Sequence, residues 1–312
     1  MLANEKFKKS LPLHNQPRDI ANLTYSKINA DRFKGTTNYY LFLEGESDES
    51  LFVNFIDAKV TILPGKHGNK TKSKNSGGKT WVRDVMQEIQ RRDQTALSFV
   101  FAIIDSDYDK FVKPKYKNTR NIFFIEPNSL GTMMWSLKVF RQKLSKYLKI
   151  LKGDKKTDID FEKWLVAKCN SIALGIGLLR LTNEIEGVNM DFKILKDSPL
   201  KYIKNQSFDS KRFLSNLSGK NLNKILTTLQ REFKRAPTIN SPKIYDYLND
   251  HDITRALSSL TDPSKYHYIV KKLEGTSKED GWLVKNFQME EFKKTILYKK
   301  ISKSAYAACL KN

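Results

Sequence analysis

The sequence predicts an α/β fold: a mostly parallel β-sheet flanked by helices, followed by a mainly α-helical C-terminal region. Two observations predict it. Between residues 38 and 126, short runs of aliphatic and aromatic residues, typical of strands buried on both faces, alternate with amphipathic segments. After Ser129 the strand pattern disappears, and apolar residues recur at helical spacing. Strands that alternate with helices form parallel sheets with helices packed on their faces.

The expected strands end at carboxylate, glycine or proline residues, and they cover residues 38–45, 60–63, 97–105 and 121–126. A short helix is expected over residues 48–56, with Asp48 near its N-cap. Another helix begins near Thr80. Its apolar residues at helical spacing are Trp81, Val82, Val85, Met86 and Ile89. Residues 1–36 are polar and irregular, so we expect an N-terminal arm there.

The second half of the sequence begins with an expected long amphipathic helix over residues 130–151. Further helices are expected over residues 161–181, 210–217, 221–233, 243–248, 253–260 and 287–299. We therefore expect a sheet domain over residues 37–150 and a helical C-terminal domain over residues 151–312.

The composition of the 312 residues indicates a folded, strongly basic protein with a formal net charge of +22. Such a field attracts polyanions, which makes nucleic acid the leading partner class. The alternative is a lysine-rich surface that only aids solubility. The two cysteines, Cys169 and Cys309, exclude a disulfide framework and a four-cysteine zinc site. Because neither a signal peptide nor a long apolar run is evident, we expect a cytoplasmic protein without a membrane span.

A loop over residues 66–79 is rich in lysine and ends in Gly78-Lys79-Thr80, as a phosphate-binding P-loop does. The P-loop motif requires glycine where this chain has Ser73, so nucleotide hydrolysis by this loop is disfavoured. Lysines of this loop, and of a basic stretch after residue 109, instead suit a nucleic-acid backbone, where each can displace a counterion. The candidate contacts are Lys66, Lys70, Lys72, Lys74, Lys110, Lys113 and Lys115.

Acidic residues follow two of the expected strands. Glu44 and Asp48 come after the first strand, and Asp105 and Asp107 end the third. The carboxyl ends of parallel strands meet at one edge of the sheet, where ligands bind, and carboxylates are the oxygen ligands that Mg²⁺ prefers. The sequence therefore predicts a Mg²⁺ or Mn²⁺ site made of these four acids, with Asp109 as an additional candidate. The alternative is that the acids cap helices or lie in solvated loops.

This order of a hydrophobic strand, Glu44-Gly45 and Asp48, then a second strand with Asp105 and Asp107, resembles the TOPRIM domain. That domain is shared by topoisomerases, primases and overcoming-lysogenization-defect nucleases. Within the family, the chain is most similar to the small nuclease subunits of PARIS-type anti-phage systems. Three further segments carry this likeness: Gly77–Val82, Pro127–Gly131 and Asn249–Asp252. Gly131 departs from the pattern, since relatives often carry glutamate there, and Glu126 is a candidate substitute.

The resemblance implies metal-dependent cleavage of phosphodiester bonds by the TOPRIM-like domain. Asp105 and Asp107 would hold the metal, Glu44 would bind a second ion or transfer a proton, and Asp48 would be a further ligand. Lys79 would stabilise negative charge in the transition state. The resemblance also implies a toxic effector of anti-phage defence that an ABC-type ATPase partner keeps inactive, with tRNA favoured over DNA as the substrate. A homodimer is left open.

Two further residues have alternative interpretations. His251, next to Asp252, suits a general base or a metal ligand, or else the capped first turn of a helix. Tyr108 resembles a topoisomerase nucleophile only in residue type, because topoisomerases place that tyrosine outside the TOPRIM domain. A different class of function is a non-catalytic nucleic-acid-binding or adaptor subunit of a defence or DNA-repair complex. The presence of Glu44, Asp105 and Asp107 argues against that class.

Overall fold

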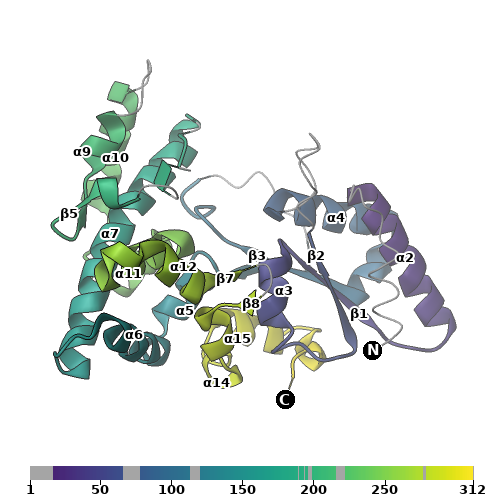
Figure 1. Ribbon diagram of the computed structural model, residues 1–312. Coiled ribbons are helices and arrows are strands. Elements are labelled where there is room, and N and C mark those ends of the chain that lie inside the picture. Colours follow the sequence, from purple (N-terminus) through teal and green to yellow (C-terminus); the bar gives the residue numbers. More distant parts are fainter. Residues whose placement is uncertain are drawn as a thin grey trace. The chain divides into compact units, whose positions relative to one another are not determined.

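The computed structural model describes residues 17–65, 78–112, 120–188, 190–192, 194–195, 199–215, 222–276 and 279–311. The chain divides into two compact units (Figure 1). The sheet unit contains Met1–Asp105, Lys115–Ile125 and Gln288–Asn312, and the helical unit contains Ser106–Pro114 and Glu126–Phe287. This division differs from the expected boundary at residue 150. The last segment of the chain belongs with the sheet, and the helices directly after residue 129 belong with the helical unit.

The sheet is four-stranded and parallel, with the strand order β2-β1-β3-β4 (Figure 1). Its strands are β1 (Tyr39–Leu43), β2 (Val60–Pro64), β3 (Val100–Asp105) and β4 (Ile122–Ile125). The central strands β1 and β3 are almost continuously buried, because helices or the C-terminal segment cover both of their faces. The predicted α/β class, with a parallel sheet flanked by helices and a helical C-terminal region, is confirmed.

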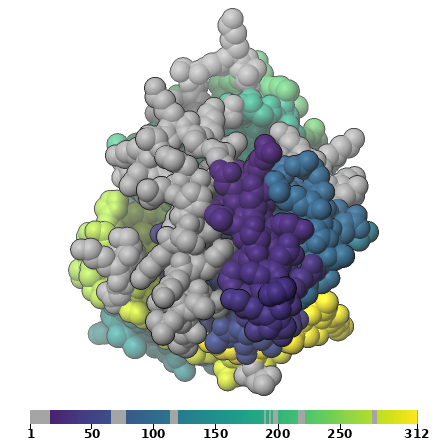
Figure 2. Space-filling view, turned by 90° about the vertical axis from the view of Figure 1, so that its right-hand side faces the viewer, coloured from purple at the N-terminus to yellow at the C-terminus, as the bar shows by residue number. Residues whose placement is uncertain are grey.

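One face of the sheet packs against α2 (Pro17–Phe33) and α4 (Gly78–Arg92). Tyr40 and Phe42 of β1 point to this face, as the period-2 alternation of a strand requires. They join Ile20 of α2 and the apolar positions of α4 that the sequence predicts, all of which are buried. Figure 2 shows α2, in purple, lying beside α4, in blue, on the surface of the unit.

The opposite face is covered by α3 (Glu46–Phe52) and by the end of the chain, which contains α14 (Met289–Phe292), α15 (Ile296–Ser302) and η5 (Ala307–Cys309). The ring of Phe292 stacks on Phe55 with centroids 4.5 Å apart. Tyr306 stacks on Phe101 of β3 at 4.6 Å. These aromatic contacts hold the C-terminal segment on the sheet.

The third strand is shorter than expected. Residues Gln94–Phe99 form the 3₁₀ helix η1, so the strand begins at Val100 and not at Leu97. The Asp93 carboxylate accepts a hydrogen bond from the Thr95 N–H at 2.7 Å and so caps this helix. The apolar run continues through Leu97 because its side chain is buried under the helical turn. Burial, and not strand geometry, explains the hydrophobic pattern there.

The single helix expected over residues 130–151 is two helices, α5 (Leu130–Ser136) and α6 (Lys138–Lys152). Leu137 between them has an extended backbone with a ψ of 119°. The Arg141 guanidinium donates hydrogen bonds to the carbonyls of Trp135 and Ser136 at 2.8 and 2.7 Å. This side chain satisfies the carbonyls that end α5, so the helix stops although the apolar pattern continues.

The helical unit continues with α7 (Asp158–Glu186), α9 (Ser210–Ser215), α10 (Leu222–Arg235), α11 (Asp250–Thr261), α12 (Tyr266–Glu274) and α13 (Trp282–Asn286). Short elements join them: η2 (Pro199–Tyr202), β5 (Ile203–Lys204), β6 (Ser207–Phe208), η3 (Pro242–Asp246), η4 (Pro263–Lys265), β7 (Gly275–Thr276) and β8 (Glu279–Asp280). The sequence did not predict α12 and α13. The helix expected over residues 287–299 is interrupted, because Thr295 caps the start of a new helix, α15.

Helix α7 is the one described helix that is long and apolar enough to cross a membrane by length and composition alone. Within the structure, 67% of its most apolar window is buried, as in the core helix of a soluble protein. Cys169 of this helix is a free, buried cysteine, and Cys309 near the end of the chain is another. Burial raises the pKa of the Cys309 thiol to about 12, so this thiol stays protonated and unreactive at neutral pH.

Candidate active site at the carboxyl edge of the sheet

The strand order changes direction between β1 and β3. The chain passes from β1 to β2 on one side, then crosses to β3 on the other side of β1. In open α/β sheets, ligands bind outside the carboxyl ends of the strands at such a switch point. Glu44 directly follows β1, and Asp105 is the last residue of β3. The two acids therefore flank the position where this architecture binds ligands.

Glu44 and Asp105 are in direct contact across the switch point. The Glu44 carboxylate accepts a hydrogen bond through Oε1 from the Asp105 backbone N–H at 2.7 Å. The Gly78 N–H donates to the Glu44 carbonyl at 3.0 Å, and the Gly65 N–H donates to the Leu43 carbonyl at 2.9 Å. The end of β1 is thus held between β3 and the start of α4. Both acids are only partly buried, so a ligand could reach them.

Lys79 lies in the first turn of α4, directly after the glycine that bonds Glu44. Gly78 has a φ of +77°, a left-handed conformation that glycine adopts readily. The positive end of the 15-residue helix therefore lies next to Glu44. A phosphate at the sheet edge would meet both the helix N-terminus and the Lys79 ammonium group.

Asp48 begins α3 by capping. Its Oδ2 accepts a hydrogen bond from the Gly45 N–H at 3.1 Å, and it lies in the first turn, where an acid is favoured by the helix dipole. This is the role that the alternative interpretation of the sequence expects. The capping contact accounts for Asp48 without a metal.

Asp107, Asp109 and Glu126 belong to the helical unit. Asp107 has a φ of +45° and donates its N–H to the Asn128 carbonyl at 2.9 Å. The Ser106 hydroxyl donates to the carbonyls of Pro127 and Asn128 at 3.1 and 3.2 Å. These bonds fasten the turn that carries Asp107 and Asp109 to the segment that follows Glu126. The structure thus brings these two acidic segments together within one unit.

The donors at the sheet edge fit a hard divalent cation in kind. Magnesium is commonly bound by one or two carboxylates together with substrate phosphates. Glu44 and Asp105 would supply those carboxylates. Among the residues that the structure describes, however, no group of three or more histidine, cysteine, aspartate or glutamate side chains is arranged to hold a metal ion. The four-acid site expected from the sequence is therefore not assembled in this conformation.

The packing of Asp250 explains why residue 131 is glycine. A Cβ atom at Gly131, in α5, would overlap the Cβ of Asp250 at the start of α11. The expected glutamate of the family could not fit there without moving one of these helices. The exchange is thus a consequence of how α5 and α11 approach each other.

Asp252 does not orient His251. Its carboxylate is fully buried and accepts hydrogen bonds from Arg180 at 2.6 and 3.0 Å and from Arg255 at 2.9 Å. His251 is exposed, and its Nδ1 lies 3.3 Å from Glu274 Oε1. The side chain of Asn249 caps α11 by accepting from the His251 N–H at 3.1 Å. The capped helical turn is therefore the interpretation that the structure supports.

The hydrogen bond to Glu274, with a contribution from the charge of Asp250, raises the pKa of His251 from 6.5 to about 9. The ring is then protonated at neutral pH, a state unsuited to a general base or metal ligand. Because the folded-state pKa is the higher one, the stabilisation is complete below about pH 6.5 and is lost as the pH rises through about 9.

We expect an NMR titration of His251 to show a midpoint near pH 9. Glu274→Gln should lower this midpoint towards the ordinary histidine value, because the main partner of the imidazolium loses its charge. Glu290→Gln, which changes an exposed acid of α14, is the matched control and should leave the midpoint unchanged. A midpoint near 6.5 in the unmodified protein would contradict the contact.

Tyr108 and Lys110 have structural partners. The Tyr108 hydroxyl is buried and donates to the Tyr247 carbonyl at 3.3 Å, and burial raises its pKa, so it is not an accessible nucleophile. Lys110 forms an ion pair with Asp246. The remaining predicted nucleic-acid contacts lie outside the described residues, and these are Lys66, Lys70, Lys72, Lys74, Lys113 and Lys115.

No family model matches this chain, and neither a curated protein nor a solved structure is significantly similar to it. The likeness to TOPRIM proteins therefore rests on the sequence motifs. The geometry of the switch point is independent of that likeness.

Proposed function

We propose that this chain is a metal-dependent nuclease of the TOPRIM type, which hydrolyses phosphodiester bonds in nucleic acid, with tRNA favoured over DNA. The observation that carries the proposal is the contact between the Glu44 carboxylate and the Asp105 N–H at the switch point. It joins acids from two separate sequence segments at the position where an open α/β sheet binds its ligand. The net charge of +22 supports a polyanionic substrate.

Each residue would have a distinct role. Glu44 and Asp105 would hold Mg²⁺ or Mn²⁺, with Asp107 as a further ligand. When bound, such an ion activates a water nucleophile and polarises phosphoryl oxygens. Lys79 and the N-terminus of α4 would bind the substrate phosphate and offset the charge that develops on it. Glu44 is also placed to accept or return a proton near the end of β3.

The cellular role that we propose follows from the resemblance to PARIS-type nuclease subunits. The chain would be a toxic effector of anti-phage defence, kept inactive by an ABC-type ATPase until infection is sensed. In that case the chain should be toxic when expressed alone and harmless when the partner is present.

The test is cleavage of tRNA and plasmid DNA by the purified chain with Mg²⁺ or Mn²⁺. We expect Glu44→Gln and Asp105→Asn each to lower the rate by about 10²–10⁴-fold, because a carboxylate that acts at the reacting centre is lost. Asp107→Asn is a suitable third variant, since asparagine tolerates the left-handed backbone at this position. Glu88→Gln, which removes an acid paired with Arg91 on α4, should leave the rate unchanged.

Cleavage that survives both Glu44→Gln and Asp105→Asn would refute the proposed site. Binding of nucleic acid without cleavage, in either metal and with the ATPase partner present, would refute the nuclease. That second result would favour the non-catalytic adaptor.

A further inference from the structure

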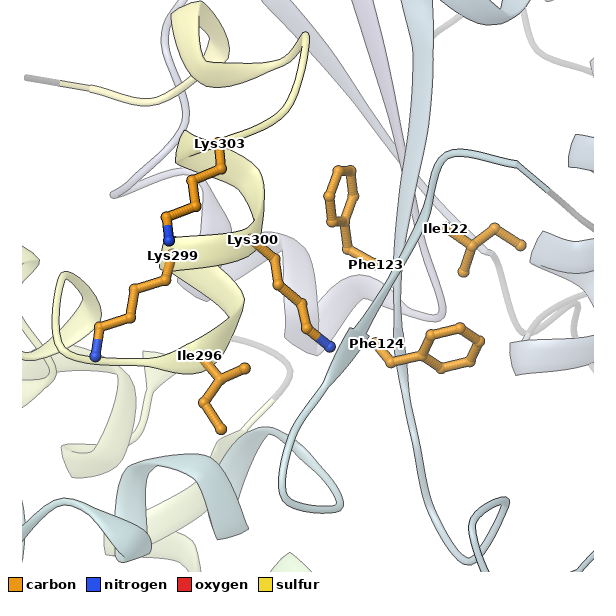
Figure 3. A pocket seen from close by; sticks show the side chains of 7 residues that line it. All are labelled: Ile122, Phe123, Phe124, Ile296, Lys299, Lys300 and Lys303. Carbon is orange, nitrogen blue, oxygen red and sulfur yellow. The ribbon is translucent and has the colours of Figure 1, made fainter.

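A groove of about 450 Å³ lies at the outer edge of the sheet, in the sheet unit (Figure 3). Residues 122–124 of β4 form one side, and Ile296, Lys299, Lys300 and Lys303 of the α15 segment form the other. We call it the β4/α15 groove. In the described sheet, β4 pairs only with β3, so its other side faces this groove.

The charge of the groove is positive. Lys299, Lys300 and Lys303 are all exposed, and no acidic residue lines the groove. With the described residues, neither Lys299 nor Lys303 forms an ion pair. The sequence from Phe292 to Lys311 contains no acid at all. These lysines are therefore available to a polyanion.

The floor of the groove is apolar and rigid. Figure 3 shows Phe123 and Phe124 pointing to different sides of β4, with the lysines of α15 opposite. Phe123 packs edge-on against Tyr306, and Arg83 lies 5.8 Å from the ring centroid of Phe124. Ile296 is 47% exposed beside them. Apolar and aromatic surface next to a row of cations is the combination that binds single-stranded nucleic acid, because bases stack while phosphates are neutralised.

The register of the sheet leads from this groove to the candidate active site. Phe124 lies opposite Ile104, and Ile125 lies opposite Asp105. The carboxyl end of the groove is thus one strand away from the acid that ends β3, a spacing of about 5 Å between neighbouring strands. A chain bound along β4 would reach the switch point without crossing another element of the sheet.

We propose that the β4/α15 groove binds single-stranded nucleic acid and directs it to Glu44 and Asp105. This inference rests on the proposed function for the direction of the strand, and on the groove itself for binding. An acidic peptide added to the edge of β4 is the competing occupant. Nucleic acid is favoured because β4 has only 4 residues, so few backbone bonds are available, and because the groove ends beside the candidate site.

The test is fluorescence anisotropy with a labelled 20-nucleotide single-stranded RNA, in EDTA so that no cleavage occurs. A variant with Lys299→Gln, Lys300→Gln and Lys303→Gln should raise the Kd at least tenfold. Its log–log salt dependence should fall in slope by about 2, since each lost phosphate contact on a single strand accounts for about 0.7. A charge-matched control changes Lys163, Lys271 and Lys272, exposed lysines of the helical unit, to glutamine and should raise the Kd less than threefold.

An equal loss of affinity in the two triple variants would overturn the inference, because only the overall charge would then matter. It would also be overturned if a poly-glutamate peptide bound in a Lys299-dependent manner while RNA affinity stayed unchanged in the groove variant. The two proposals fail separately. Groove-dependent binding by a chain that never cleaves leaves the groove and refutes the nuclease, whereas normal binding and cleavage by the groove variant refute the groove alone.

Discussion

Replacing Gly177 by alanine should destabilise the protein by at least about 3 kcal/mol. Gly177 lies in α7, where a Cβ atom would overlap the Tyr247 carbonyl oxygen. This oxygen belongs to the backbone and accepts a hydrogen bond from the Tyr108 hydroxyl at 3.3 Å, so it has little freedom to move. Relief would require the backbone around Tyr247 to shift away from α7.

Gly175→Ala, two residues earlier in the same helix, is the matched control for this prediction. Its Cβ would lie 3.1 Å from the Phe208 side chain, which can move by a few tenths of an ångström. Alanine also favours a helix by up to about 1 kcal/mol relative to glycine. We therefore expect a change within about 1 kcal/mol, measured by urea unfolding followed by circular dichroism. Similar unfolding free energies for the two variants would show that α7 does not approach Tyr247 so closely.

Asp252→Asn should cost about 3–5 kcal/mol, because it leaves buried cations without their counter-charge. Asp252 has no exposed surface, and its two oxygens bind Arg180 of α7 and Arg255 of α11. The Arg180 guanidinium also lies 4.5 Å from the ring centroid of Phe192. Asparagine keeps the shape of the side chain, so the measured loss reports the charge and not a cavity.

The control for Asp252 is Asp158→Asn, also at a helix start. Asp158 bonds Lys149 at 2.7 Å, but half of its side chain is exposed, so solvent screens the pair. We expect at most about 1 kcal/mol for this variant. If Asp252→Asn cost no more than Asp158→Asn in urea unfolding, the buried ion pair would not link α7 to α11.

Local sequence patterns were sufficient to predict the strands and their acidic ends. The hydrophobic runs before Glu44 and Asp105 are continuous because both faces of β1 and β3 are buried. The alternation of these runs with helices indicated a parallel sheet, and a parallel sheet brings strand ends to one edge. The apolar spacing after Thr80 likewise predicted the buried side of α4.

Patterns of the same kind were misleading where a single polar side chain decides the local structure. Asp93 turns an apolar run into a 3₁₀ helix, and Arg141 ends α5 in the middle of a helical pattern. The sequence also paired His251 with its neighbour Asp252, although the partner of His251 is Glu274 and Asp252 binds two arginines. Hydrophobic periodicity reports burial and spacing, but it carries no information about which hydrogen bond a side chain makes.

By itself, the sequence determined the class of fold, the basic charge and the acids that end β1 and β3. Only the tertiary structure decided that Glu44 bonds the Asp105 backbone, that Phe292 and Tyr306 return the chain end to the sheet, and that α15 places lysines beside β4. The physical reason is distance along the chain. Periodicity and capping act over a few residues, whereas these contacts join segments whose proximity depends on the packing of the whole sheet unit.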